Sequence, residues 1–180
     1  MDGIELEYWD SCTFLALLKN EPHRTGEPVY LQNQSRQFDM GALGLVTSAI
    51  AVAEIFESRL TKEQSNRFRS MYTRSNFQFI DATYQICNVA SEIRGHYKDN
   101  PIKDDGKELY PSAPDAIHVA SAIAAQSFSK RSILLITFDS ENKPAKNGIG
   151  LTKISGNVAG KYQLTICRPP TNNQQDNLFP

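Results

Sequence analysis

The hydrophobic positions of this chain form two alternating kinds of pattern. Short apolar runs, typical of strands, occupy residues 4–9, 43–47, 77–80, 133–137 and 163–167. Between them, apolar residues at helical spacing predict helices over residues 12–19, 29–40, 49–60, 61–71, 81–97 and 114–129. The segment 98–110 is charged and rich in turn-forming residues, so we predict a loop there. Strands that alternate with helices indicate a mostly parallel sheet covered by helices on both faces.

Polar residues at the ends of these patterns predict where several helices begin and end. Ser48 precedes the 49–60 helix and Asp81 begins the 81–97 helix, so each is a candidate N-cap. Thr61 followed by Gln64 is typical of a capping box, and Gly41 follows the 29–40 helix as a stop signal.

The length of 180 residues fits one domain, which we place at residues 1–168. The last stretch, 169–180, is polar and rich in proline, and a flexible C-terminal tail is predicted there. A formal net charge of -1 gives no overall basic field, so binding of a nucleic acid would require a local patch.

Three cysteines without a C-x-x-C pair argue against a disulfide framework or a zinc ribbon, and they predict small core residues in a reducing compartment. The chain shows no apolar run long enough to cross a bilayer and no signal-peptide pattern at its start. A cytoplasmic protein with no membrane association is therefore predicted.

Two aspartates follow predicted strands directly. Asp10 comes after the first strand and Asp139 after the fourth. In open parallel sheets, ligands bind beyond the carboxyl ends of the strands, near the point where the strand order reverses. If these two strands are neighbours there, the two carboxylates repel each other unless a cation or a shared proton joins them.

Two further acids lie on helices where contact with the sheet is expected. Glu54 follows an apolar run in its helix, and Asp115 lies in the first turn of a largely apolar helix. Each of the four acids has an ordinary explanation when taken alone. Asp10 could cap a helix, Asp115 could interact with a helix dipole, Glu54 could be a solvated edge residue, and Asp139 could be a turn residue. Their shared position at one end of the sheet favours a joint site.

The chemistry that fits four carboxylates is metal-assisted hydrolysis of a phosphodiester. Mg²⁺ and Mn²⁺ prefer hard oxygen ligands, and such ions polarise a phosphate and activate water. We find no convincing Ser-His-Asp or Cys-His constellation that would supply a protein nucleophile.

The motifs that carry these acids resemble the PIN-domain family, and within it the VapC-like ribonuclease toxins of type II toxin–antitoxin pairs. The resemblance spans about residues 4–140 and rests on an ordered series of segments: WDSCTFLALL, VTSAIAVAEIF, FIDATYQICNVASEIRGHY, PDAIHVASAIA and LLITFD. It departs from the family in a long segment at 100–112 and in a longer, glycine-rich stretch after Asp139.

This resemblance implies a three-layer α/β/α sandwich with a five-stranded, mostly parallel sheet in the order 3-2-1-4-5. It also implies an endoribonuclease that cuts RNA with Mg²⁺ or Mn²⁺, a cognate antitoxin partner and a homodimer. The implied catalytic and metal-binding residues are Asp10, Glu54, Asp115 and Asp139. Ser11 and Thr137 match small hydroxyl residues that line the family's site.

An RNA substrate requires cationic groups near such an acidic site. Arg94 is the first candidate for a phosphate contact, and Lys143 and Lys146, shortly after Asp139, are the next. His118 lies one turn after Asp115, but a lone histidine on an apolar helix is predicted to be a hydrogen-bonded core residue.

Other functions were weighed against the nuclease. A haloacid-dehalogenase-type phosphatase needs a second aspartate at position 12, where this chain has Cys12, and a dinucleotide-binding domain needs a G-x-G-x-x-G motif that is missing after the first strand. A phosphorylation receiver needs an acid pair and a matching lysine that we do not find. Two alternatives stay open: a PIN-like binding or scaffold module with little or no nuclease activity, and a non-toxin nuclease for RNA processing or DNA.

Overall fold

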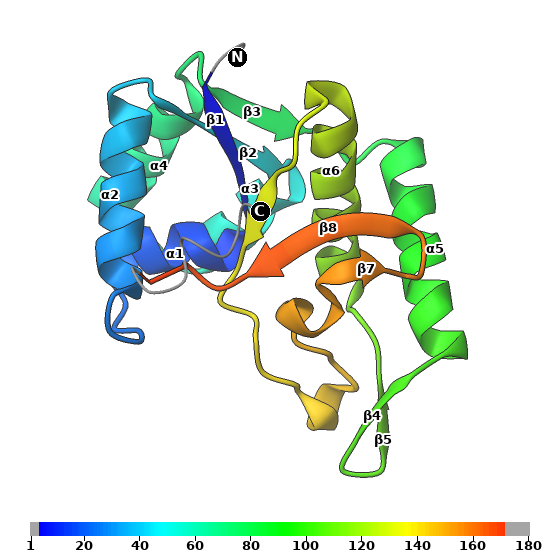
Figure 1. The fold of residues 1–180 in the computed structure, drawn as a ribbon. Coiled ribbons are helices and arrows are strands. Elements are labelled where there is room, and N and C mark those ends of the chain that lie inside the picture. Colours follow the sequence, from blue (N-terminus) through cyan, green and yellow to red (C-terminus); the bar gives the residue numbers. More distant parts are fainter. Residues whose placement is uncertain (1–3, 172–180) are drawn as a thin grey trace.

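The computed structural model describes residues 4–171 and shows a mixed α/β fold with a mostly parallel central sheet between two layers of helices (Figure 1). The six strands of the sheet lie in the order β3-β2-β1-β6-β8-β7. Their bounds are Phe77–Ile80 for β3, Leu43–Ser48 for β2, Glu5–Trp9 for β1, Leu134–Ile136 for β6, Tyr162–Cys167 for β8 and Gly156–Val158 for β7. The first five run parallel, which confirms the predicted order 3-2-1-4-5.

The sixth strand, β7, was not predicted. It pairs antiparallel with β8 across a tight turn in which Ala159 and Gly160 both adopt positive φ angles. Only Val158 of its three residues is buried, so the strand leaves no apolar alternation in the sequence. Its short length also protects the sheet edge from pairing with other chains.

Helices cover both faces of the sheet (Figure 1). One face packs against four helices: α1 (Ser11–Lys19), α2 (Glu27–Asp39), α3 (Ile50–Glu57) and α4 (Lys62–Tyr72). The other packs against α5 (Tyr84–Asp99), α6 (Ala113–Ser129) and the short 3-10 helix η2 (Leu151–Ile154). A second 3-10 helix, η1 (Pro144–Lys146), lies in the segment after β6.

Side chains alternate between the two faces of β1, so consecutive residues of this strand belong to two separate hydrophobic cores. Tyr8 and Trp9 are neighbours in the sequence and are both fully buried, but they belong to opposite hydrophobic clusters. In β6, Leu135 packs on the α6 side while Ile136 packs on the α1 side. Both strands are thus buried on both faces, as the apolar run at 133–137 predicted.

Two of the predicted helix caps are confirmed and two are wrong. Thr61 and Gln64 form the capping box of α4, and Gly41 follows α2 with a positive φ angle. Ser48 does not cap α3, because it is the last residue of β2 and pairs with Ile80 in the sheet. Asp81 does not cap α5, since the hydroxyl of Thr83 accepts the Ile86 amide there.

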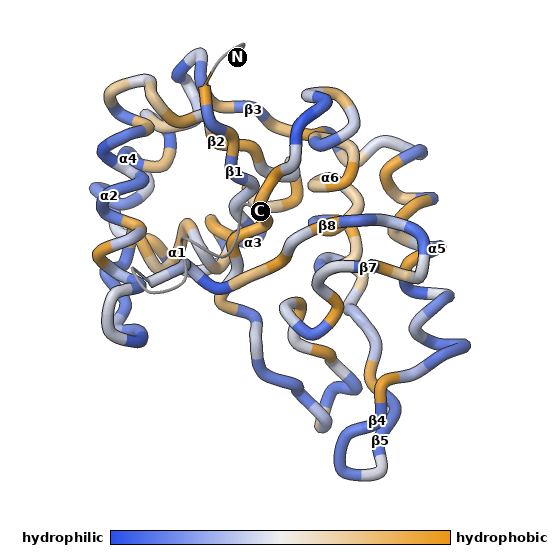
Figure 2. The backbone as a smooth tube through the Cα atoms, in the orientation of Figure 1, coloured by the Kyte–Doolittle hydropathy of each residue, from blue (hydrophilic) through white to orange (hydrophobic). Residues whose placement is uncertain are grey.

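The predicted loop at 98–110 is also wrong, because most of it forms a hairpin. β4 (Ile102–Asp104) and β5 (Lys107–Leu109) pair around Asp105 and Gly106, which both have positive φ angles. An Asp-Gly pair is the turn that a two-residue hairpin favours. The hairpin extends from the body of the molecule and is largely hydrophilic (Figure 2), with Leu109 as its buried anchor.

Several smaller expectations can be compared with the structure. Cys87 is exposed rather than a core residue, while Cys12 and Cys167 are partly buried, and all three are free thiols. Within residues 4–171, no helix is long and apolar enough to cross a membrane. Most of the predicted C-terminal tail, residues 172–180, lies outside the described residues.

A buried carboxyl group lies beneath α2. Glu7 of β1 is almost inaccessible, and its oxygens accept hydrogen bonds from the side chains of Trp9, Tyr30 and Gln34. Burial raises the pKa of Glu7 above its ordinary value of 4.5, although these hydrogen bonds oppose the shift. The folded protein therefore retains a proton at Glu7 over a pH interval in which the unfolded chain has released it.

This gives a pH-dependent prediction for stability. As the pH rises from about 4.5 through the raised pKa, the free energy of unfolding of the wild type should fall relative to that of Glu7→Gln, which cannot ionise. The slope should approach about 1.4 kcal/mol per pH unit. Urea denaturation of both proteins from pH 4 to pH 8 measures this difference, and a difference that stays constant with pH would contradict it.

Candidate active site

The carboxyl ends of β1 and β6 meet at one point of the sheet. Trp9 pairs with Ile136 in parallel register, so Asp10 and Thr137 are the next residues on adjacent strands. The Asp10 amide donates to the Ile136 carbonyl at 3.4 Å, which continues the pairing by one step. The predicted acidic site therefore begins where two buried strands end.

Asp10 is held by an unusually full set of donors. Its Oδ1 accepts the amide of Thr13 at 3.0 Å and the hydroxyl of Thr13 at 2.9 Å, which makes Asp10 the N-cap of α1. The thiol of Cys12 donates to the same carboxylate, and the Thr137 hydroxyl donates to Oδ2 at 2.5 Å. A carboxylate has about four acceptor positions, so nearly all of them are in use. The capping role foreseen for Asp10 is thus real.

Thr137 and Cys12 connect Asp10 to the loop that carries Asp139. The Thr137 hydroxyl accepts the Asp139 amide at 2.9 Å, and the Cys12 sulfur accepts the Phe138 amide at 3.1 Å. Burial and the neighbouring charge of Asp10 raise the pKa of the Cys12 thiol well above its usual range, so the thiol stays protonated and able to donate. Thr137 lies where the prediction placed a site-lining hydroxyl.

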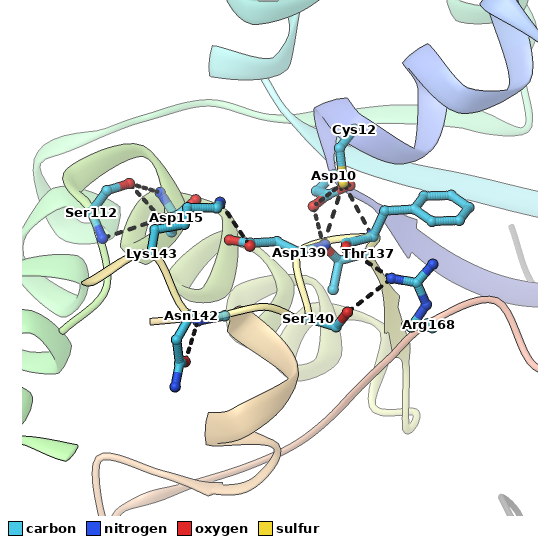
Figure 3. A network of polar contacts seen from close by, with 12 residues as sticks. Asp10, Cys12, Ser112, Asp115, Thr137, Asp139, Ser140, Asn142, Lys143 and Arg168 are labelled. Carbon is cyan, nitrogen blue, oxygen red and sulfur yellow. Dashed lines mark hydrogen bonds and ion pairs between the residues drawn. The ribbon is translucent and has the colours of Figure 1, made fainter. Parts of the chain in front are cut away.

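Arg168 fixes the same loop from the other side. Its Nη1 donates to the Phe138 carbonyl at 3.1 Å and to the Ser140 hydroxyl at 2.8 Å, on either side of Asp139 (Figure 3). Its other nitrogens form a two-point ion pair with Glu27, at 2.6 and 2.9 Å. The position of Asp139 thus depends on a residue that follows β8.

Asp139 forms an ion pair with Lys143. The Lys143 Nζ lies 2.7 Å from Asp139 Oδ1, and the side chains are 54% and 11% exposed, respectively (Figure 3). Burial raises the pKa of Asp139 above its ordinary value; Lys143 opposes this shift, and the charges of Asp115 and Asp10 add to it. Asp139 is therefore close enough to Asp115 and to Asp10 for their charges to disfavour its ionised form.

Asp115 serves as the fourth residue of a capping box at the start of α6. Its carboxylate accepts the Ser112 amide at 3.2 Å and the Ser112 hydroxyl at 2.5 Å, while the Asp115 amide donates back to that hydroxyl. The ordinary explanation for Asp115, a first-turn acid, therefore holds. Burial lowers the pKa of Lys143. The hydrogen bond and charge of Asp139, followed by the charge of Asp115, raise this pKa above its ordinary value. Asp115 thus contributes to the helix cap and to the acidic cluster.

Glu54 is directed toward a histidine rather than toward the other acids. Its Oε2 lies 2.8 Å from His118 Nε2, and the Tyr8 hydroxyl lies 2.9 Å from His118 Nδ1. Burial raises the pKa of Glu54, but the hydrogen bond and charge of His118, with a contribution from Ser11, bring it below the ordinary value. His118 is a buried, hydrogen-bonded residue, as predicted. Ser11, the other predicted lining residue, lies at the start of α1 beside Asp10.

The acids do not form a ready-made metal cage. In the part of the chain that the structure describes, no three carboxylate, imidazole or thiol side chains are grouped so that they could hold an ion. The contacts above give the reason, because each carboxylate is engaged by its own partner: Asp10 by hydroxyls, Asp115 by Ser112, Asp139 by Lys143 and Glu54 by His118. The structure thus leaves Glu54 in a separate pair with His118, while Asp139 is the acid that is influenced by the charges of both Asp115 and Asp10.

The three basic candidates have different surroundings. Arg94 donates through Nε to the Pro111 carbonyl at 3.0 Å and lies over the Tyr110 ring, so it anchors the end of the hairpin. Lys143 lies inside the acidic cluster, and Lys146 is exposed at the end of η1. Sequence reasoning missed Thr13 and Arg168. The spacing from Asp10 to Thr13 is that of an N-cap and its third residue and could have been found, whereas Arg168 gave no local signal.

No protein-family model matches the chain. No curated protein sequence matches it either. Among solved structures, FitAcB from Neisseria gonorrhoeae is 17% identical over 91% of this chain and 97% of that chain, with a TM-score of 0.51. FitAB bound to an IR36 DNA fragment is 16% identical over 91% and 94%, with a TM-score of 0.50. These likenesses show that this chain shares the mixed α/β fold of both structures.

Proposed function

We propose that this protein is a Mg²⁺- or Mn²⁺-dependent endoribonuclease and acts as the toxin of a toxin–antitoxin pair. The observation that carries the proposal is the meeting of Asp10, Asp115 and Asp139 at the carboxyl end of the parallel strands. Asp10 follows β1 and Asp139 lies just beyond β6, the strand that pairs with β1, and after burial the charges of Asp115 and Asp10 raise the pKa of Asp139. Such clustered repulsion costs stability, so it is typical of a site that works with a cation.

The donor set fits the proposed ion in chemistry. Carboxylate oxygens are the ligands that Mg²⁺ and Mn²⁺ prefer, and the cluster offers no imidazole nitrogen that would favour softer metals. Asp139 and Asp115 are the first candidates to hold the ion, since within residues 4–171 Asp139 has Lys143 as its one side-chain partner. Asp10 would contribute its charge, or an oxygen released by Thr137. Glu54 would join only by leaving His118.

In this mechanism the bound ion would polarise the scissile phosphate and help to generate the attacking hydroxide. The chain's own residues set the geometry. Thr137 and Cys12 hold Asp10 against the Asp139 loop, and Arg168 holds that loop from the opposite side. Lys146 and Lys143 lie on the segment next to the cluster and are the proposed contacts for RNA phosphates, whose approach an acidic site alone would oppose.

The toxin role rests on the sequence motifs that resemble VapC-like proteins and on the fold shared with FitAcB and FitAB. With it come the proposed partners: an RNA substrate, a cognate antitoxin and a second copy of the chain. A cytoplasmic location follows from the same role.

A second candidate is a binding module with the same fold and little or no nuclease activity. The observation in its favour is that all four acids are engaged by neighbouring side chains, so the site could be a purely structural network. A cluster built for stability alone would not need three like charges, and this argues for the nuclease.

Cleavage of total cellular RNA by the purified protein tests the proposal. We expect discrete fragments with Mg²⁺ or Mn²⁺, none with EDTA, and at least a ~100-fold lower rate for Asp139→Asn, which removes a metal-ligand charge. Glu5→Gln is the matched control, because Glu5 is an exposed acid at the amino end of β1, the opposite end of the strand from Asp10, and the variant should cleave at the wild-type rate.

The outcomes separate the two candidates. Loss of cleavage in Asp139→Asn alone supports the nuclease. Absence of cleavage in a folded wild type that also fails to bind Mn²⁺ would favour the binding module. Equal cleavage by wild type and Asp139→Asn would show that the acidic cluster is not the active site.

A further inference from the structure

Lys143 places a positive charge inside the acidic cluster. Its ammonium lies 2.7 Å from Asp139 Oδ1, and Figure 3 shows the side chain of Lys143 directed at Asp139. Both Asp139 and Asp115 act on Lys143 through their charges. The charge of Lys143 therefore acts on Asp115 as well as on its ion-pair partner Asp139.

The backbone at Lys143 is fixed, while its side chain has room to move. The Lys143 amide donates to the Gly148 carbonyl at 2.7 Å, and the Lys143 carbonyl accepts the amides of Lys146 and Gly148 at 2.9 and 3.1 Å. The side chain is 54% exposed and carries several rotatable bonds. The ammonium can thus leave Asp139 for solvent without any change in the main chain.

Lys143 and a divalent cation would each neutralise negative charge in this cluster. Asp139 is only 11% exposed, and the charges of Asp115 and Asp10 disfavour its ionised form, so a positive charge placed beside it stabilises the carboxylate. An ammonium on Asp139 Oδ1 uses the oxygen that a metal ion would need, so the two cations exclude each other there. The ion pair with Lys143 also explains how the acids can lie near one another although, within residues 4–171, no three of them form a metal-binding group.

We propose that Lys143 is a built-in counter-ion that competes with the divalent cation for Asp139, and so raises the metal concentration at which the site fills. The inference rests on the proposed function, since it takes the acidic cluster to be a metal site. It gives the protein a charge-compensated state without metal, in which the acids stay close and the fold stays stable.

Titration with Mn²⁺ in the absence of RNA tests this, with free Mn²⁺ measured by electron paramagnetic resonance. Lys143→Met should bind Mn²⁺ about 1.5-fold to fivefold more tightly than the wild type, the range expected when a partly exposed ion pair is removed. Lys146→Met removes the same charge from the neighbouring turn and should leave Mn²⁺ affinity unchanged. Lys143→Gln should repeat the result of Lys143→Met.

Thermal unfolding gives a second readout. Without metal, Lys143→Met should unfold at a lower temperature than the wild type, because Asp139 loses its counter-charge. Saturating Mn²⁺ should then raise its unfolding temperature by more than it raises that of the wild type.

Each result has one meaning. Equal or weaker Mn²⁺ binding by Lys143→Met would overturn the counter-ion role while leaving the proposed nuclease intact, provided that the wild type binds. An equal gain in Lys146→Met would show a general charge effect and would also overturn it. Absence of Mn²⁺ binding in all variants at millimolar concentration would overturn the metal site itself, and the proposed function with it.

Discussion

Replacing Asp10 with asparagine should abolish RNA cleavage and also lower the free energy of unfolding. The carboxylate accepts hydrogen bonds from the Thr13 amide and hydroxyl, the Cys12 thiol and the Thr137 hydroxyl. In asparagine, an NH₂ group replaces one carboxylate oxygen. Because this group donates hydrogen bonds and cannot accept them, the donors that point at it would lose their acceptor. Because Asp10 is only 5% exposed, we expect a loss of about 1–3 kcal/mol. Cleavage should fall at least ~100-fold, since the charge and its position are both lost.

Urea denaturation and the RNA cleavage assay measure the two effects. Thr137→Val and Thr137→Ser form a matched pair for the first, because the valine removes the hydroxyl that joins Asp10 to the Asp139 amide and the serine keeps it. The valine variant should lose stability and the serine variant should lose much less. An Asp10→Asn protein as stable as the wild type would contradict the donor network, and one that still cleaves would remove Asp10 from the active site.

Gly150→Ala should destabilise the protein by about 1–3 kcal/mol, the range found for overfilled cores. A Cβ atom on Gly150 would lie 2.6 Å from the Ser140 carbonyl carbon and 2.8 Å from the Glu141 amide nitrogen. Both atoms belong to the backbone, which cannot avoid the new Cβ atom by a change of rotamer as a flexible side chain could. The main-chain angles at Gly150, φ -67° and ψ 129°, suit any residue, so the penalty is purely steric. Because the crowded backbone directly follows Asp139, cleavage should fall as well.

Gly95→Ala is the control for this prediction. Gly95 lies within α5, and a Cβ there would have no atom within 4 Å. The same substitution should therefore raise stability by about 0.5–1 kcal/mol, the usual gain from alanine over glycine in a helix. Thermal or urea unfolding of the two variants should give shifts of opposite sign. A loss in both, or no loss in Gly150→Ala, would contradict the close packing at Ser140.

The parallel sheet was predictable because its signals are local. The apolar runs at 43–47 and 133–137 mark strands buried on both faces, and the residues that follow such strands meet at one edge. That argument placed Asp10 and Asp139 after neighbouring strands, and the pairing of β1 with β6 confirms that these strands are adjacent. The sequence could therefore predict which acids follow the carboxyl ends of the strands.

The partners of the acids were not predictable, because they come from distant segments or from competing local roles. Glu54 and His118 lie 64 residues apart, and no spacing rule indicates that their side chains meet. Asp115 is a helix-cap residue, as its ordinary explanation predicted, and its role in an active site stays a prediction. The Asp-Gly turn of the β4–β5 hairpin is present in the sequence, but the charged residues around it favoured the prediction of a loop.

The hairpin and the segment after Asp139 are joined to each other. Tyr110 exchanges backbone hydrogen bonds with Asn147 and Ile149, and the Asn142 side chain donates to Asp104 at 2.7 Å. Neither stretch can be shortened alone without leaving unmatched groups on the other. Among chains that share this fold, the two lengths should therefore vary together, so that both insertions are present or both are missing.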